Sequence, residues 1–166
     1  TYRSSNESES YIFSNSGNDS NGPTRAFTFD FDYIYTGTSQ GVFRSDNNGE
    51  LWESKSNGLT SLLSHGLINV NSKLIHVSPF GVSLSNNQGD NWISAGLGGY
   101  DVRCITNIED TLFVGTNGDG LFKSIDWGNN WIPINNGSSS SNFRAIEIKG
   151  DILFAGDLAG GMVVEA

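Results

Sequence analysis

The sequence predicts an all-β protein built from repeated four-stranded antiparallel sheets, as in the blades of a β-propeller. Three observations predict this class. The chain has 166 residues, of which 21 are Gly, 23 Ser and 19 Asn, so it is rich in residues that form tight turns. No segment shows a sustained 3.6-residue apolar period, which argues against helices. A pattern recurs about every 40 residues, and four short strands per repeat of that length are typical of a propeller blade.

Tryptophan marks the repeat. Three eight-residue boxes end in Trp52, Trp92 and Trp131, which lie 40 and 39 residues apart. All three follow the pattern S-x-[DN]-x-G-x-x-W. We expect the first and third side chains to bond nearby backbone N–H groups, the Gly to adopt a positive φ, and the Trp to begin the next strand as a buried ring. The structural positions of the boxes are Ser45, Asn47, Gly49, Trp52, Ser85, Asn87, Gly89, Trp92, Ser124, Asp126, Gly128 and Trp131.

The strands of each unit follow in order along the chain. In the unit of the third box they are expected at about 103–107, 111–115, 120–124 and 131–134, where β-branched and aromatic residues lie between Gly, Asn and Asp turns. The same template predicts two strands at the start, twelve in three full repeats and three at the end. The single domain 1–166 therefore divides into a partial blade 1–23, repeats at about 24–61, 62–100 and 101–141, and a partial blade 142–166.

The box resembles the Asp-box repeat, also called the bacterial neuraminidase repeat, and the resemblance covers essentially the whole chain. It implies a β-propeller. Asp-box proteins include sialidases, xyloglucan-cleaving glycoside hydrolases, sortilin-type receptors and factors that assist photosystem II assembly, so the fold alone does not choose a function. The chain departs from the family pattern at Asn47 and Asn87, where Asp is usual. This departure weakens any chemical role for the box.

About four blades are predicted, whereas propellers of the resembled family usually have six to eight. Three arrangements follow. The chain is a piece of a larger propeller, or two copies pair as a homodimer that completes an eight-bladed ring. In the third arrangement, a strand around residues 11–15 completes the blade begun at residue 144, and one chain closes on itself with four blades.

Charge and composition exclude several classes of function. The net charge is −9, which repels nucleic acid and anionic membranes, and no apolar run is long enough for membrane insertion. The single Cys104 cannot form an internal disulfide, and no Cys/His cluster predicts a metal site or cofactor. His65 and His76 lack a nucleophile and an orienting acid in any recognisable motif, so no catalytic residue is assigned.

Three arginines occupy one repeat position, twelve residues before the Gly that follows each second strand. They are Arg25, Arg103 and Arg144; in the second repeat the equivalent position is Gly66, with His65 beside it. We expect these side chains to gather near the mouth of the central channel, and their planar donors make them candidates for an anion-binding site. The alternative is that each arginine pairs with a local acid and ties neighbouring blades together, the candidate acids being Asp30, Asp101 and Glu147.

Two further features are candidates for binding. Arg3, Arg44 and Lys123 precede boxes on a strand, where a solvated or blade-bridging role is expected. Trp127 lies in the turn of the third box and is expected to be exposed. Its ring could stack on a sugar or pack locally.

The function favoured by the sequence is a non-enzymatic binding or scaffold propeller, extracellular or at the cell surface. Its mouth would recognise a protein, an acidic small ligand or a glycan. The alternative is a fragment of an Asp-box glycoside hydrolase, sialidase-like or xyloglucanase-like, with catalytic residues partly outside this chain. Hydrolysis of a glycosidic bond needs two facing carboxylates about 5 to 10 Å apart, and the sequence singles out no such pair.

Overall fold

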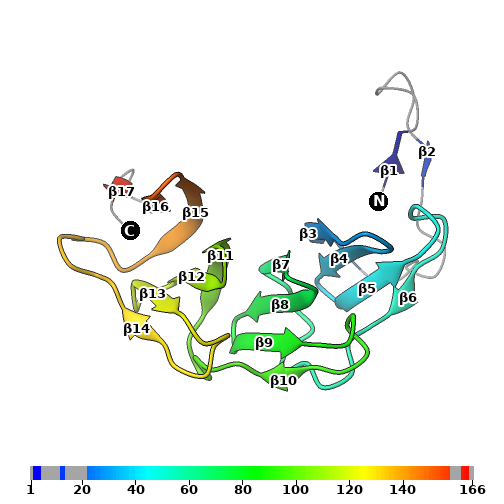
Figure 1. Cartoon of the computed structure of the whole chain (residues 1–166), viewed down its shortest axis with the longest axis horizontal. Helices are drawn as coiled ribbons and strands as arrows, with labels where there is room; N and C mark the ends of the chain where they lie inside the picture. Colours follow the sequence, from blue (N-terminus) through cyan, green and yellow to red (C-terminus); the bar gives the residue numbers. More distant parts are fainter. Residues whose placement is uncertain (1, 5–11, 14–21, 158–161, 165–166) are drawn as a thin grey trace.

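The computed structural model describes residues 2–4, 12–13, 22–157 and 162–164. Within these ranges the chain is all-β, as the sequence predicts, and it contains no helix that could span a membrane. Five antiparallel sheets stand side by side in an open arc, and the first strand of each complete sheet lies on the concave side (Figure 1). This is the arrangement of propeller blades, with the ends of the arc apart.

The strands follow the chain order from the concave side outward. The N-terminal hairpin is β1 (Tyr2–Arg3) and β2 (Ile12–Phe13). Three full blades follow: β3 (Thr24–Phe29), β4 (Ile34–Thr38), β5 (Gly41–Ser45) and β6 (Glu53–Ser54); β7 (Gly66–Val70), β8 (Lys73–Ser78), β9 (Gly81–Ser85) and β10 (Ile93–Ser94); and β11 (Val102–Ile108), β12 (Thr111–Thr116), β13 (Leu121–Ser124) and β14 (Ile132–Pro133). The C-terminal sheet is β15 (Phe143–Lys149), β16 (Ile152–Asp157) and β17 (Met162–Val164).

A β-bulge opens the inner strand of three sheets. The register skips one residue between Thr24 and Ala26, and it skips in the same way in β11 and β15. The skipped residue is the arginine in every case, so its side chain is re-aimed out of the ladder. In the second blade, Gly66 pairs with Val77, as Ala26 pairs with Gly37. His65, rather than Gly66, therefore stands at the arginine position.

The core lies between successive blades, because neighbouring sheets pack face to face. A second-strand residue of one blade packs with an inner-strand residue of the next in each of three clusters. These pairs are Tyr35 with Leu67, Ile75 with Ile105, and Phe113 with Ile146. The three interfaces are thus built to one plan, and each repeat is stabilised mainly by its neighbours.

The three boxes form the same turn. Ser45 Oγ accepts a hydrogen bond from Gly49 N–H at 2.9 Å and donates one to Asn47 Oδ1 at 2.9 Å, and Asn47 Oδ1 accepts from Leu51 N–H at 2.9 Å. The boxes at Ser85 and Ser124 repeat these bonds. The fourth and fifth residues all have positive φ, as a type I′ turn requires: Asn48 and Gly49, Gln88 and Gly89, and Trp127 and Gly128.

Two of the three box tryptophans, Trp92 and Trp131, join their blade to the one before it. Trp92 is 4% exposed and donates its indole N–H to Lys55 O at 2.7 Å. Trp131 is half-buried and donates to Ala95 O at 2.8 Å, in the same way. Trp52 is buried, and its N–H has no acceptor among the described residues. The box therefore fixes a turn and bridges two blades.

Candidate functional site

The side chains at the start of the inner strands meet at one edge of the arc, which we call the mouth edge. Antiparallel pairing brings the start of each first strand beside the loop between the second and third strands. The mouth edge therefore carries Arg25, His65, Arg103 and Arg144 together with loop residues such as Asn117. The boxes follow the third strands and lie at the opposite edge.

A hydrogen-bonded network links the third blade to the C-terminal sheet. Arg103 Nη2 donates to the Asp101 carboxylate through a short ion pair. Asn117 Nδ2 donates to Asp101 Oδ2 at 3.0 Å, and Arg144 Nη2 donates to Asn117 Oδ1 at 3.0 Å. Sequence analysis missed Asn117, although its place in the loop after a second strand puts it beside the next inner strand. Asp101 and Asn117 together hold Arg103 and orient Arg144.

His65 extends this network toward the second blade. Its Nδ1 lies 2.8 Å from Val102 O, so Nδ1 carries the hydrogen, and Nε2 can accept from Arg103 Nη1 at 3.3 Å. Burial is the main cause that lowers the pKa of His65 below its usual value. The imidazole is therefore neutral near pH 7 and positions Arg103 rather than adding a charge.

Two of the three arginines keep donors for a ligand. Arg25 is exposed and makes no hydrogen bond or ion pair within the described ranges. Arg144 is exposed and donates only to an amide. The local acids considered for them have other partners: Asp30 accepts from the Tyr35 hydroxyl at 2.9 Å, and Glu147 Oε1 accepts from its neighbouring backbone N–H at 3.0 Å. Asp101 alone of these acids pairs with an arginine.

Two members of the second row of basic residues, Arg3 and Arg44, bridge blades. Arg3 Nη2 lies 2.8 Å from Glu50, and Arg44 Nη1 lies 3.5 Å from Asp90. Each arginine also donates to a carbonyl of the same turn, two residues before the acid, at 3.2 Å. Each therefore contacts the box turn of the following blade. These two arginines are part of the scaffold.

Trp127 is half-buried, so the expectation of an exposed ring is wrong. It packs against the cluster between the second and third blades, and Lys73 Nζ lies 4.5 Å from its ring centroid. Local packing accounts for the ring. The cation occupies the face that a sugar would need.

Ser64 and His76 form a pair that sequence analysis missed. Ser64 Oγ lies 2.9 Å from His76 Nε2, and both residues are 0% exposed. His76 Nδ1 has no partner among the described residues, and burial lowers the pKa of His76 to about 4. A buried serine with no acid to orient its histidine is a core contact rather than a nucleophile.

Cys104 and the acidic side chains add no reactive centre. Burial raises the pKa of the Cys104 thiol to about 12, so the thiol stays protonated. In the ranges described, no group of three His, Cys, Asp or Glu side chains is placed to hold a metal ion.

Comparison with known proteins supports the fold. No family model and no curated protein sequence matches the chain. Among solved structures, the computationally designed Ika4 protein matches with a TM-score of 0.70 and 12% identity over 86% of this chain and 90% of that one. An ancestral GH74 enzyme matches at 0.74 and 15% identity over 87% and 23% of the two chains. YCF48 bound to D1 peptide matches at 0.74 and 14% identity over 99% and 56%.

The fold of the chain follows from these similarities together with the order of strands in its sheets. The fold is that of a β-propeller. This chain spans about a quarter of the GH74 enzyme and a little over half of YCF48, so it corresponds to a part of each. A propeller of this kind is found both in a glycoside hydrolase family and in a peptide-bound protein. The arrangement of residues at the mouth edge must therefore carry the functional argument.

Proposed function

We propose that this chain is a non-enzymatic binding or scaffold propeller whose mouth edge recognises acidic groups of a protein ligand. The observation that carries the proposal is the pair of exposed guanidinium groups, Arg25 and Arg144, which have no carboxylate partner in the described ranges. The protein has twice as many acidic as basic side chains. An arginine left unpaired in that setting keeps its planar fork of donors for a ligand carboxylate.

The network beside these arginines supports the proposal. Asp101 pairs with Arg103, whereas neither Arg25 nor Arg144 has a carboxylate partner in the described ranges. Asn117 fixes one arm of Arg144 without neutralising it. A guanidinium group that is already oriented by a hydrogen bond loses less side-chain entropy on binding an anion than a freely rotating one does.

Apolar side chains in the same region favour a protein ligand over a small anion. Leu62, in the loop before β7, is 48% exposed, and Phe80, in the loop between β8 and β9, is 61% exposed. Both loops end at the mouth edge by topology. Protein interfaces combine such apolar anchors with charged contacts. The peptide bound by YCF48 is consistent with this use of the fold.

The test uses a labelled oligoglutamate peptide as the probe, with binding followed by fluorescence anisotropy. The double variant Arg25→Gln and Arg144→Gln should weaken binding at least about tenfold, because each charged hydrogen bond contributes about 1.5–3 kcal/mol. Lys149→Gln is the matched control, since it removes one exposed positive charge at the far end of β15. It should change binding less than twofold.

Asp101→Asn tests the same site by a change that should strengthen binding rather than weaken it. The amide keeps an oxygen for Arg103 but removes the negative charge from the network, so binding of oligoglutamate should strengthen. If the arginine variants lower the free energy of unfolding and leave binding unchanged, the arginines tie blades together and the proposal fails.

The alternative proposal is that the chain is a fragment of a glycoside hydrolase. The similarity to the GH74 enzyme is the observation that favours this alternative. Among the described residues, the carboxyl groups with a shifted pKa are Glu53, Asp90 and Asp126. All three have a lowered pKa, caused mainly by hydrogen bonds from Lys55 or Asn130. A general acid needs a raised pKa. Turnover of a xyloglucan oligosaccharide or a fluorogenic sialoside by the full-length parent protein would overturn the binding proposal.

We also propose an extracellular or cell-surface location, which is supported by the likeness to the extracellular domain of BT4673, with a TM-score of 0.72 and 15% identity. Labelling of intact source cells with a membrane-impermeant amine reagent tests it. Modification of this protein before lysis is the expected result. Labelling only after lysis would contradict the location and leave the proposed binding role intact.

A further inference from the structure

The three internal interfaces show what one blade requires of the next. The second-strand residues Tyr35, Ile75 and Phe113 are 0%, 0% and 5% exposed because the inner strand of the following blade covers them. Phe154 on β16 stands at the same register position, opposite Glu147 on β15. It is half-buried, and among the described residues no inner strand of a further blade covers it.

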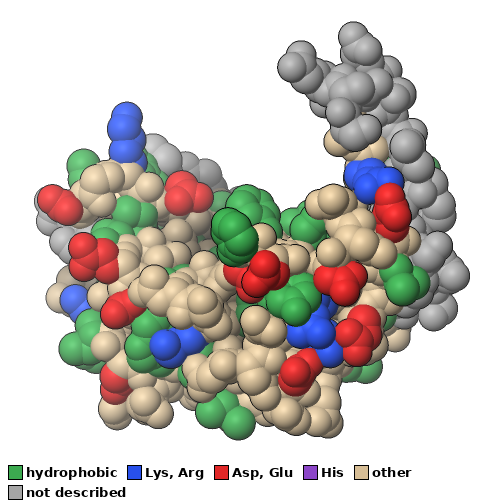
Figure 2. All heavy atoms as spheres, turned by 45° about the vertical axis from the view of Figure 1, so that its right-hand side comes forward, with side chains coloured by type: hydrophobic (Ala, Val, Ile, Leu, Met, Phe, Trp, Pro, Cys, Tyr) green, Lys and Arg blue, Asp and Glu red, His purple; other side chains and the backbone are tan. Residues whose placement is uncertain are grey.

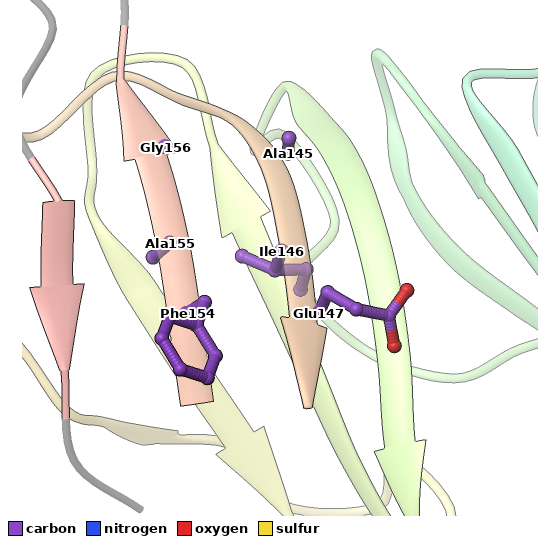
Figure 3. A pocket seen from close by; sticks show the side chains of 6 residues that line it. All are labelled: Ala145, Ile146, Glu147, Phe154, Ala155 and Gly156. Carbon is purple, nitrogen blue, oxygen red and sulfur yellow. The ribbon is translucent and has the colours of Figure 1, made fainter. Parts of the chain in front are cut away.

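The free face of the C-terminal sheet forms a hollow. It is lined by Ala145, Ile146, Glu147, Phe154, Ala155 and Gly156 from β15 and β16 (Figure 3). Ile146 and Ala155 turn their side chains to the third blade, where they join a buried cluster. Strand alternation therefore directs Glu147 and Phe154 to the open side.

Gly156 indicates what belongs in this hollow. At its repeat counterparts, an added Cβ would lie 2.9 Å from Ser64 for Gly37 and 2.7 Å from Phe143 for Gly115, both on the next blade. At Gly156 the nearest described atom lies 3.9 Å away, on Ala145 of the same sheet. Gly156 therefore repeats the glycine that two of the three covered blades carry at this position, whereas the second blade has Val77.

The N-terminal end of the arc has the complementary arrangement. Phe27 stands at the position of the buried Leu67 but is 50% exposed, and Phe29, two residues along β3, is 74% exposed. Hydrophobic side chains reach the surface along the concave edge (Figure 2). Arg3 contacts the first box just as Arg44 contacts the second, so β1 and β2 are the third and fourth strands of a blade. The first and second strands of that blade would cover Phe27.

We infer that a second copy of this chain supplies those strands. The β15–β16 hairpin of one copy and the β1–β2 hairpin of the other form one composite blade. In it, Phe154 packs on Phe27 of the second copy, as Phe113 packs on Ile146. β1 of the second copy displaces β17 from the third-strand position, so the pairing of β16 with β17 is exchanged for pairing of β16 with β1. Two such blades and three full blades from each copy close a ring of eight.

Two observations favour a second copy over closure of one chain. The two ends of the described arc lie on opposite sides of an open space, so β16 and β3 of one chain do not meet (Figure 1). The composite interface also continues the three internal ones residue for residue, with apolar side chains on both faces.

Closure has a consequence for the mouth edge, and this step rests on the proposed function. Arg25 and Arg144 lie on the first and last inner strands of the arc, so within one chain they are the most widely separated members of the site. In the ring, Arg144 becomes the neighbour of Arg25 of the second copy. The two uncommitted guanidinium groups then act on one ligand.

The experiment measures mass by light scattering on the full chain, and its readout does not depend on ligand binding. The wild type should have twice the 17.9 kDa of one chain. Phe27→Lys and Phe154→Glu should each be a monomer. Mixed in equal amounts they should form a heterodimer, because one interface is then wild type and the other joins Lys to Glu. This recovery also shows that both variants fold.

Phe31→Glu is the control, because Phe31 is 101% exposed in the turn after β3. This variant should remain a dimer. A wild type that stays monomeric at micromolar concentration would overturn the inference. So would variants that remain dimers, or a mixture that yields only monomers. Each of these outcomes would leave binding of oligoglutamate at the mouth edge to be judged by its own test.

Discussion

The box edge and the mouth edge lie at opposite ends of the same strands and differ in how strictly they repeat. Three boxes have the same turn, the same serine hydrogen bonds and the same pair of positive φ angles. The four mouth positions carry Arg, His, Arg and Arg, and each has a different set of partners. A repeated element that keeps one geometry in every blade is part of the scaffold.

The mouth edge keeps its backbone geometry but varies its side chains. Its backbone position repeats through a β-bulge, yet its side chains diverge from blade to blade. The fold fixes where the side chains stand and leaves their chemistry free. Substitutions at the two edges should therefore act on different quantities, stability at the boxes and binding at the mouth.

The largest expected effect is at a box. Trp92→Ala removes a buried ring and the hydrogen bond to Lys55 O, so it should lower the free energy of unfolding by about 3–5 kcal/mol. Arg144→Gln at the mouth should change it by less than about 0.5 kcal/mol. Urea denaturation followed by circular dichroism measures both. Equal losses for the two variants would erase the distinction between the edges.

The next effect concerns His76, which lies between the two edges and contacts Ser64 and the ring of Trp92. Its pKa in the folded protein is about 4, against 6.5 for an ordinary histidine. The unfolded chain therefore takes up a proton first as the pH falls. The contribution of neutral His76 to the free energy of unfolding is complete above pH 6.5. It declines as the pH falls toward 4, by roughly 3 kcal/mol in total.

Denaturation at a series of pH values tests this decline. His76→Gln keeps a polar partner for Ser64 but does not titrate, so its stability should vary much less between pH 6.5 and 4. The lowered pKa of His65 contributes in the same direction, and His65→Gln is therefore the comparison variant. If the decline survives in His76→Gln and vanishes in His65→Gln, the mouth residue carries it instead.

The smallest expected effect on stability is at the fourth position of a box, where the first and second boxes carry different residues. Gln88 is exposed with a φ of 59°, a conformation that Asn tolerates better, and Asn48 occupies this position in the first box. Gln88→Asn should raise the free energy of unfolding by about 0.5 kcal/mol. Gln40→Asn makes the same change at an exposed residue without a positive φ and should give no gain. The midpoint of thermal unfolding can rank the two variants.

The blade architecture could be predicted because the boxes repeat in the sequence. The spacing of Trp52, Trp92 and Trp131 defines the unit, and the described residues form the seventeen strands that this unit implies. The mouth was harder to predict. Whether Arg103 pairs with Asp101 while Arg25 stays unpaired depends on loop paths that no repeat determines. The half-buried position of Trp127 likewise depends on Lys73, 54 residues earlier in the chain.

The tryptophan bridges give this protein a set of built-in optical probes. Trp92 reports on the contact between the first and second full blades, and Trp131 reports on the contact between the second and third. Stacked repeats separate at their interfaces one after another when cooperativity is weak. Fluorescence from variants that keep only one of these indoles would therefore resolve in which order the arc comes apart.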